Sequence, residues 1–486
     1  MSDHLIFDKS RKGKVGFSLP DPDVPEIQAT DIFEGDILRT EDALLPEVSE
    51  PEVVRHFTNI STKNHHVDKD VYPLGSCTMK YNPKINDAMA QLPGFLHIHP
   101  RQPEETVQGA LSVMAELEGQ LKSITGMDRF TLQPSAGSQG ELAGVLIMHK
   151  YHETKGSRRK YILIPDTAHG TNPASVAMGG FEVMEVNSNN RGRVDLKDLK
   201  AKLSENVAGM MLTQPNTLGL FEYDITKIAR LVHEVDGLMY MDGANLNALL
   251  GIVRAVDMDF DIVHINLHKT FSTPHGGGGP GAGPIGVVDR LTEFLPVPVV
   301  DHQGDRYGLN YDLRNSVGRL HAFFGNFGIL VRAYTYISML GGEGMETVSR
   351  QAILNANYLK SRIRDRYEVF ADDHCMHEFV ISGARQKKRG VRAFHIGKRL
   401  LDFGFHAPTV YFPISVPEAL MVEPTESESK ESIDRFADAL LQIDEESREN
   451  PDQVRRAPYT TPVRRLDETT ANRDLKLRWT PGPSRR

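Results

Sequence analysis

Three side chains of this 486-residue chain have the types and the spacing to act together in chemistry: His169, Asp242 and Lys269. A lysine amine can bind an aldehyde as a Schiff base, and a buried carboxylate can keep a nearby ring nitrogen protonated. A flat imidazole can lie against an aromatic ring. Together these groups suit pyridoxal 5′-phosphate (PLP), whose protonated ring accepts the electron pair released when a bond to an amino acid's α-carbon breaks.

Each of the three residues also has an ordinary structural interpretation. Lys269 could be a surface lysine, His169 a loop histidine with satisfied hydrogen bonds, and Asp242 a cap or turn residue. Their occurrence in this order, each after a predicted strand, favours the site over three separate structural roles.

Short apolar strands separated by helical segments are the elements that would position these residues. We expect a helix over residues 225–235 and strands over residues 160–165, 207–212, 237–242 and 262–267. Polar residues follow each strand, and ligands of open parallel α/β sheets bind at the carboxyl ends of the strands. This pattern predicts an α/β fold with a large domain built on a mostly parallel sheet.

Two segments could bind a phosphate group. Ser135–Ser138 precede the apolar run Leu142–Met148, and the free N–H groups at a helix start favour an anion. Gly276–Gly279 follow Lys269, and a glycine run lets the backbone approach a phosphate closely. A dinucleotide fingerprint is excluded because the glycines follow a lysine-bearing strand and run into Pro280 instead of opening a helix.

Composition and charge exclude several classes of protein. The formal net charge of −9 argues against a general nucleic-acid binder. No apolar run approaches the roughly 18 residues of a membrane helix, and the first residues lack the pattern of a secretory signal. Cys77 and Cys375 are too few for a disulfide framework or a thiolate zinc site, so we expect no metal and a cytoplasmic location.

Four parts of the chain differ in character. We expect an N-terminal arm and substrate loop over 1–85, a large PLP-binding domain over 86–330, a smaller α+β domain over 331–450 and a basic tail over 451–486. From Gln453 onward the tail holds nine Lys/Arg against three Asp/Glu, which is typical of an arm over another surface or of a solvated end. Further helices are expected over residues 104–126, 334–340, 347–364 and 429–445, and strands over 378–381 and 419–422.

The segment Asn266–Gly281 resembles the PLP-lysine signature of glycine dehydrogenase (decarboxylating), the P-protein family of the glycine cleavage system. Tyr72–Pro83, Gln133–Glu141, His169–Ala174 and Leu420–Thr425 are similar to other segments of that family. The length is similar to that of subunit 2 in the two-subunit bacterial form, the subunit that carries the lysine.

This resemblance implies a PLP-dependent fold of type I and a role for each matched residue. Lys269 would form the Schiff base, Asp242 would pair with the pyridinium nitrogen, and His169 would stack on the ring. The remaining implied contacts are Ala136, Gly137, Ser138 and His268 around the phosphate, Thr213, Asn216 and Ala244 beside the ring, and Thr78 and Tyr81 in a substrate loop.

The implied activity is decarboxylation of glycine, with transfer of the aminomethyl group to the lipoyl arm of the H-protein and release of CO2. The implied partners are glycine, the lipoylated H-protein and subunit 1, in an α2β2 heterotetramer. Two alternatives stay open at this point. One is another PLP enzyme of fold type I, such as an amino-acid decarboxylase or a hydroxymethyltransferase, and the other is a non-catalytic scaffold subunit.

Overall fold

The computed structural model describes residues 5–41, 43–275, 281–370, 374–475 and 477–478. The chain divides into two compact units, 1–66 and 67–486, and each is described by itself. The division therefore falls before residue 85, and 67–85 belong to the second unit. The run Gly276–Gly279 noted above and Trp479, the only tryptophan of the sequence, lie outside the described residues.

The first unit is an extended segment with little core. Its helices are η1 (Ile6–Lys9), α1 (Ala29–Ile32) and α2 (Glu50–Ser61). Glu52 accepts hydrogen bonds from the backbone N–H and the hydroxyl of Ser49, so that the start of α2 is capped. Val48 is the only buried hydrophobic side chain among the described residues of this unit. Its few apolar contacts indicate that it gains little stability by itself.

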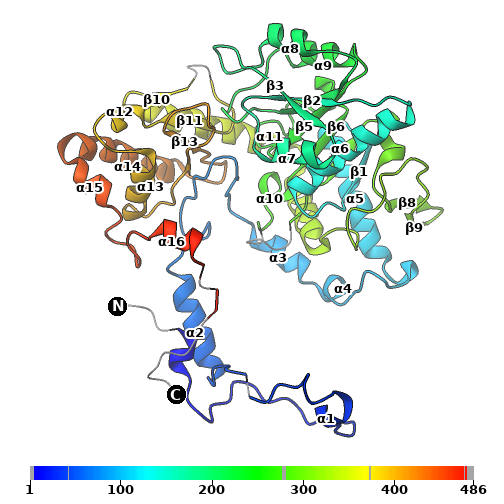
Figure 1. Cartoon of the computed structure of the whole chain (residues 1–486), viewed down its shortest axis with the longest axis vertical. Coiled ribbons are helices and arrows are strands. Elements are labelled where there is room, and N and C mark those ends of the chain that lie inside the picture. Colours follow the sequence, from blue (N-terminus) through cyan, green and yellow to red (C-terminus); the bar gives the residue numbers. More distant parts are fainter. Residues whose placement is uncertain (1–4, 42, 276–280, 371–373, 476, 479–486) are drawn as a thin grey trace. The chain divides into compact units, whose positions relative to one another are not determined.

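A seven-stranded sheet forms the centre of the second unit (Figure 1). Its order is β1-β7-β6-β5-β4-β2-β3, and β7 is the one strand that runs antiparallel to its neighbours. The predicted α/β class with a mostly parallel sheet is confirmed. The strands are β1 (Arg129–Thr131), β2 (Tyr161–Pro165), β3 (Glu182–Val186), β4 (Val207–Thr213), β5 (Leu238–Gly243), β6 (Ile262–Ile265) and β7 (Ile285–Val287).

Both faces of this sheet are covered by helices, which explains why its central strands are apolar throughout. Met210 and Leu212 of β4 belong to the core shared with α5 (Gln108–Thr125), α9 (Ile225–His233) and α11 (Phe327–Ile363). Met211 points to the other face, into the core shared with α6 (Gly137–Thr154) and α7 (Thr171–Met178). Successive strand residues thus serve opposite faces, as the pleat of a strand requires.

A smaller antiparallel sheet has its own core beside the larger one (Figure 1). Its order is β10-β11-β13-β12, and the predicted strand pieces at 378–381 and 419–422 become its two central strands. Its elements are β10 (Glu368–Val369), β11 (Phe379–Ser382), β12 (Thr409–Val410), β13 (Ala419–Val422), α13 (Ala393–Asp402), α14 (Lys430–Glu449) and α15 (Pro451–Arg456). The backbone N–H groups of Tyr459 and Thr460 donate to Asp402, so the packed part of the chain extends past residue 450.

Several boundaries differ from those expected. The predicted helix over 104–126 is a 3-10 turn, η2 (Glu104–Thr106), followed by α5, because Val107 leaves helical geometry at φ −125°. The two helices expected over 334–340 and 347–364 lie on either side of a break in α11, where Gly341 leaves helical geometry at φ +61° and ψ −172°. The other described elements are α3 (Lys84–Ala90), α4 (Pro93–Leu96), α8 (Leu196–Lys202), η3 (Val256–Met258), α10 (Leu267–Thr270), η5 (Asp289–Phe294), β8 (Val299–Gln303), β9 (Arg306–Asn310), α12 (Ala384–Lys387) and α16 (Glu468–Arg473).

The loop that contains Gly75 is fixed to the smaller sheet. Leu74 forms a β-bridge with Val422, and the N–H of Gly75 donates to the carbonyl of Met421 at 3.2 Å. A Cβ at residue 75 would lie 2.3 Å from the Met421 side chain and 2.7 Å from its backbone. We therefore expect Gly75→Ala to displace the loop and to lower the free energy of unfolding by about 1–3 kcal/mol.

Urea denaturation of the two proteins measures this difference. Gly94→Ala is the matched control, because nothing lies within 4 Å of a Cβ at that position. A Gly75→Ala protein as stable as the Gly94→Ala control would show that this close packing against Met421 is wrong.

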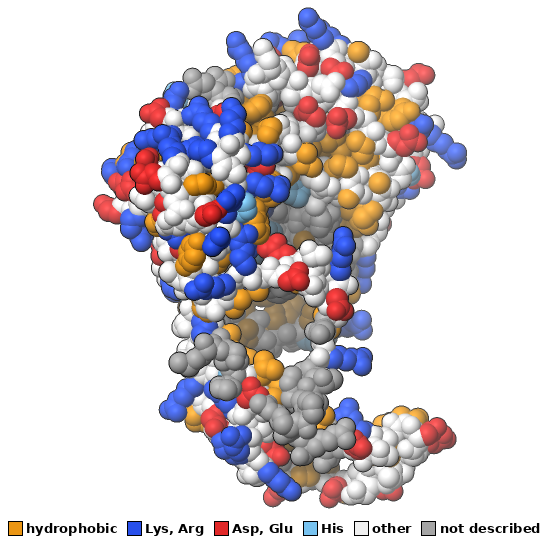
Figure 2. All heavy atoms as spheres, turned by 60° about the vertical axis from the view of Figure 1, so that its left-hand side comes forward, with side chains coloured by type: hydrophobic (Ala, Val, Ile, Leu, Met, Phe, Trp, Pro, Cys, Tyr) orange, Lys and Arg blue, Asp and Glu red, His pale blue; other side chains and the backbone are white. Residues whose placement is uncertain are grey.

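Charged side chains crowd the surface of the part that carries α12 to α15 (Figure 2). The basic residues there are mostly paired: Arg385 with Glu368, and both Lys387 and Arg392 with Glu418. This pairing limits the net positive charge of that surface.

In the described part of the chain, no helix combines the length and the apolar character needed to cross a bilayer.

Candidate active site

A cavity of about 280 Å³ opens beyond the carboxyl ends of β4, β5 and β6. Nine of the ten predicted cofactor residues line it: Ala136, Gly137, Ser138, His169, Thr213, Asp242, Ala244, His268 and Lys269. The tenth, Asn216, does not. The other lining residues are Ser76, Glu141, Thr171, Pro215, Thr217, Asn245, Asn266, His377 and Glu378.

Lys269 lies in a one-turn helix, α10, and not directly at a strand end. β6 stops at Ile265, because the chain turns at Asn266 to begin α10. The N–H of Lys269 donates to the Asn266 carbonyl at 3.1 Å, which fixes the backbone of the lysine. Its amine forms no hydrogen bond or ion pair with another described residue. It is therefore a free amine at the wall of the cavity, available to an aldehyde.

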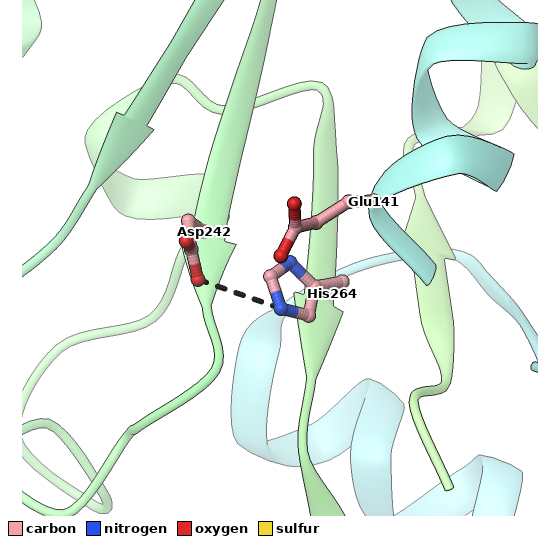
Figure 3. Close-up of side chains that lie close together, drawn as sticks. All are labelled: Glu141, Asp242 and His264. Carbon is pink, nitrogen blue, oxygen red and sulfur yellow. Dashed lines mark ion pairs between the residues drawn. The ribbon is translucent and has the colours of Figure 1, made fainter. Parts of the chain in front are cut away.

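Asp242 places a buried carboxylate at the end of β5 (Figure 3). Its Oδ1 accepts from the N–H of Ala244 at 3.1 Å, and its Oδ2 has only a long contact of 3.5 Å with Thr213 Oγ1. Burial opposes ionisation, but the neighbouring His264, the Lys269 charge and the Ala244 amide hold the pKa of Asp242 below its usual value. The group is an ionised acceptor with one oxygen available to a ring N–H.

His264 of β6 orients this carboxylate. Its Nε2 lies 3.4 Å from Asp242 Oδ1, and its Nδ1 lies 2.7 Å from the hydroxyl of Tyr240. Burial raises the pKa of Tyr240 well above its usual value, so the phenol stays protonated and its O–H donates a hydrogen bond to Nδ1. Burial also lowers the pKa of His264, so the ring is neutral and carries its hydrogen on Nε2, facing Asp242.

The Tyr240 hydroxyl makes a testable contribution. Tyr240→Phe leaves His264 Nδ1 without its donor, and an unsatisfied buried group costs about 1–3 kcal/mol. We expect urea denaturation to show a free energy of unfolding lower by that amount. The turnover number should also fall, because the His264 ring that faces Asp242 no longer has a fixed tautomer. Tyr223→Phe changes an exposed tyrosine and serves as the control. Equal stability of the two variants would contradict this role.

Glu141 lies next to this pair and extends from α6 (Figure 3). Burial, and then the charge of Asp242, raise the pKa of Glu141 to about 8, so it is a neutral acid at pH 7. It accepts hydrogen bonds from the hydroxyls of Thr171 at 2.8 Å and Ser175 at 3.2 Å. Oxygen or nitrogen atoms of Glu141, Asp242 and His264 lie within 4.8 Å of one another, a grouping that could also accept a cation. The expectation of no metal stays a prediction.

The N-terminus of α6 provides an anion site of the expected kind. The helix begins at Gly137, and Ala136 before it forms no side-chain cap, so the first N–H groups are free. A Cβ at Gly137 would lie 2.3 Å from Oδ1 of Asn266, so only glycine lets the helix end approach β6 this closely. His268 Nδ1 is buried and has no hydrogen-bond partner among the described residues. This unpartnered ring nitrogen beside a helix start with free N–H groups fits a bound phosphate group.

His169 lies two residues before the start of α7 and lines the same cavity. Its Nδ1 lies 2.9 Å from the hydroxyl oxygen of Thr171 and 3.3 Å from the Thr171 backbone nitrogen, and these contacts hold the ring in place. Burial lowers the pKa of this ring, which favours the neutral form. The ring also makes an edge contact with Phe412, with 5.5 Å between centroids. A neutral, laterally packed imidazole suits a stacking role.

Three predicted residues lie outside the cavity lining. Asn216 turns inward to organise its own loop, donating to the Gly192 carbonyl and accepting from the N–H groups of Leu218 and Leu220. Thr78 is buried against Glu423. Tyr81 is 44% exposed. Their segments reach the site, but these side chains do not line it.

Several residues of the site were not found from the sequence. Ser76 belongs to the predicted loop Tyr72–Pro83, where φ of +67° turns its N–H toward Glu378. His264 could have been noticed as a polar residue within an apolar strand. His377 and Glu378 come from the smaller domain and precede β11, and no local pattern marks them as part of a site.

Solved structures with this fold define the class of protein. A glycine decarboxylase (P-protein) of the glycine cleavage system, in inhibitor-bound form, has a TM-score of 0.73 at 19% identity and covers 85% of this chain and 95% of its own. A glutamate decarboxylase of Lactobacillus brevis has a TM-score of 0.65 at 12% identity and covers 87% and 97%. At these identities the likeness concerns the fold, which is that of PLP-dependent enzymes of fold type I.

The chain belongs to the glycine cleavage system P-protein family, whose model matches residues 24–314. A second model, for the C-terminal domain of glycine dehydrogenase, matches residues 348–459. A probable glycine dehydrogenase (decarboxylating) subunit 2 of Chloroherpeton thalassium is 56% identical over 99% of this chain and 98% of its own length. One of the same description from Chlorobaculum tepidum is 57% identical over 98% and 99%. The family resemblance seen in the sequence is confirmed.

Proposed function

We propose that this chain decarboxylates glycine with PLP bound to Lys269, and passes the aminomethyl group to the lipoyl arm of an H-protein. The observation that supports the proposal most is the joint placement of a free Lys269 amine, the ionised Asp242 and the α6 N-terminus around one cavity. Family membership gives the reaction class, and the cavity supplies the groups that such a reaction needs.

The cofactor would be held at three places. Lys269 would bind its aldehyde carbon, the N–H groups that begin α6 with Ser138 and His268 would hold its phosphate, and Asp242 would accept a hydrogen bond from its ring nitrogen. When bound, PLP supplies a protonated ring that accepts the electron pair left as CO2 departs. His169 would lie against the ring, with Thr213 and Ala244 beside it. Asn216 would act only through its loop, and Thr78 and Tyr81 belong to a loop that would border the substrate.

Each residue contributes a defined step. Lys269 would bind the cofactor and, once the amine of glycine has replaced it there, would be free to accept or return a proton near the α-carbon. Asp242 would keep the ring nitrogen of the cofactor protonated. Pro215 and Ser76 line the cavity and would limit the access of water to it. Exclusion of water favours the reaction, because the charged carboxylate of glycine becomes neutral CO2.

The transfer step needs an oxidant, and the lipoyl disulfide supplies it. The electron pair of the broken Cα–carboxylate bond forms a new carbon–sulfur bond, the sulfur–sulfur bond breaks, and the second sulfur takes up a proton. No nicotinamide is required on this chain. We further propose that it works in the cytoplasm, in an α2β2 assembly with a subunit 1, as the description of its relatives as subunit 2 suggests.

Carboxyl-labelled glycine tests the proposal. The PLP-loaded chain with its partner subunit should release labelled CO2 from glycine, and the rate should depend on lipoylated H-protein. Release of CO2 without any dependence on the lipoyl arm would favour another PLP decarboxylase of this fold. Complete absence of bound PLP would favour a scaffold subunit.

A further inference from the structure

Two residues that the proposed chemistry has not used come from the smaller domain. His377 and Glu378 directly precede β11, are 2% and 5% exposed, and line the same cavity as Lys269. Glu423 follows β13 and lies against them. Atoms of these three side chains approach one another within 4.8 Å. Two carboxyl groups this close and this buried do not both ionise readily, so one of them keeps its proton.

The hydrogen-bond donors decide which carboxyl group is charged. Glu423 accepts from the N–H of Thr78 at 3.1 Å and its hydroxyl at 2.9 Å, and from the side-chain amides of Asn245 at 3.0 Å and Asn247 at 3.4 Å. Glu378 accepts from one donor among the described residues, the N–H of Ser76 at 2.7 Å. Donors stabilise the charged form of a carboxyl group. Burial raises the pKa of Glu423 to about 7 and that of Glu378 to about 8, so Glu423 loses its proton first and Glu378 is the acid that keeps an O–H to donate.

His377 is a second neutral donor beside it. Burial lowers the pKa of His377 to about 3, so the ring is uncharged. Neither ring nitrogen has a hydrogen-bond partner among the described residues, although Nε2 lies 3.8 Å from Glu378 Oε1. A buried imidazole without a partner at a cavity wall is costly unless a ligand satisfies it.

The cavity also has an unusual balance of charge. None of its described lining residues is an arginine, and Lys269 is the only lysine among them. That lysine is used to bind the cofactor. A substrate carboxylate entering this cavity therefore meets neutral donors and no guanidinium.

We propose that His377 and Glu378, acting as neutral hydrogen-bond donors, hold the carboxylate of the amino-acid substrate; this rests on the proposed function. This arrangement suits a carboxylate that must leave as CO2. A cation paired with the carboxylate would stabilise the bound amino acid more than the transition state, in which that charge disappears, and would slow the reaction. Neutral donors orient the carboxylate with less of this penalty.

The protonation of Glu378 makes substrate binding depend on pH. The groups that face it are Glu423, His377, Lys269, the Ser76 amide and the nearby Cys77 thiol. Burial, and then Glu423, raise the pKa of Glu378 to about 8, against the opposing effects of the amide and Lys269. As the pH rises through this value, Glu378 loses its donor hydrogen and becomes negative. Glycine binding should then weaken.

Binding titrations of the PLP-loaded chain with its partner subunit test the assignment. We expect Glu378→Ala to weaken glycine binding by about 10- to 100-fold, the effect of losing a buried hydrogen bond to a charged group. Binding of methylamine, which lacks the carboxylate, should be unchanged. Glu378→Gln keeps a neutral donor, so it should bind glycine within a few-fold of the wild type and lose the weakening above pH 8. Glu445→Gln, an exposed residue of the same domain, is the control.

A second measurement does not depend on the cofactor. Because folding raises the pKa of Glu378, its contribution to stability is present at low pH and is lost as the pH rises toward about 8. The melting temperature of cofactor-free Glu378→Gln should therefore rise relative to wild type between pH 5 and pH 8, whereas that of Glu445→Gln should not.

Two results would overturn the assignment while leaving the proposed function intact. One is wild-type glycine affinity in Glu378→Ala, and the other is an equal loss of glycine and methylamine binding. If the wild-type assembly itself binds PLP but no glycine, the proposed function fails and the assignment falls with it.

Discussion

Lys269→Ala should abolish the visible absorption of the Schiff base between PLP and the protein and should greatly slow the release of CO2 from glycine. Lys269 is the only lysine among the described residues that line the cavity, and it forms no competing ion pair there. Removing a covalent catalytic group while binding groups remain leaves a residual rate, so the turnover number should fall by about 10⁴-fold or more. Absorption spectra and labelled CO2 release measure the two effects.

The control for this variant is Lys150→Ala, which changes a partly exposed lysine on α6. It should keep both the spectrum and the rate. Because the Lys269 side chain has no hydrogen-bond partner among the described residues, its removal should leave the thermal stability of the cofactor-free chain almost unchanged. A Lys269→Ala protein that still shows the visible band and turns over glycine would remove this lysine from the mechanism.

Asp242→Asn should retain the fold but lose most of the activity. The asparagine oxygen can still accept from the N–H of Ala244, so the end of β5 keeps its backbone contact. What is lost is the negative charge that would hold a proton on the ring nitrogen. Removal of one preorganised electrostatic contact at a reacting centre costs about 10²- to 10³-fold in rate, and we expect a turnover number lower by that factor.

The pH profile separates this effect from simple misfolding. The pKa of Asp242 lies below its ordinary value, so in the wild-type protein the carboxylate stays charged throughout the neutral range. Activity should therefore show no acid limb near neutrality from this residue, and the loss in Asp242→Asn should be the same at every pH tested. Asp257→Asn, an exposed residue paired with Arg254, is the control. Full activity of Asp242→Asn would contradict the assigned role.

The sequence predicted the parts of the site that lie at strand ends. His169 follows β2, Asp242 lies at the end of β5, and Lys269 lies in α10, which follows β6; the carboxyl ends of parallel strands meet at one edge of a sheet. The helix start at Gly137 could be predicted for the same reason. These positions depend on local pattern and on the topology of the class.

Residues whose position depends on packing between distant segments could not be predicted in this way. Glu378 reaches the cavity because the smaller sheet binds the loop at Gly75, and 302 residues separate Glu378 from the Ser76 amide that contacts it. Asn216 was predicted to line the site but does not, because its side chain accepts a hydrogen bond within its own loop. The strands β1, β3 and β7 were also missed. β1 and β7 have three residues each, and β3 is largely exposed and polar at an edge of the sheet.

The most direct test of the account is borohydride reduction of the PLP-loaded protein, followed by peptide mapping. Reduction makes the bond between the cofactor and its lysine permanent, so the modified peptide identifies the residue. The account predicts a pyridoxyl group on Lys269, with Lys80 and the other lysines unmodified, since Lys80 is held in a buried ion pair with Glu426. A pyridoxyl group on another lysine, or no adduct at all in the presence of PLP and the partner subunit, would contradict it.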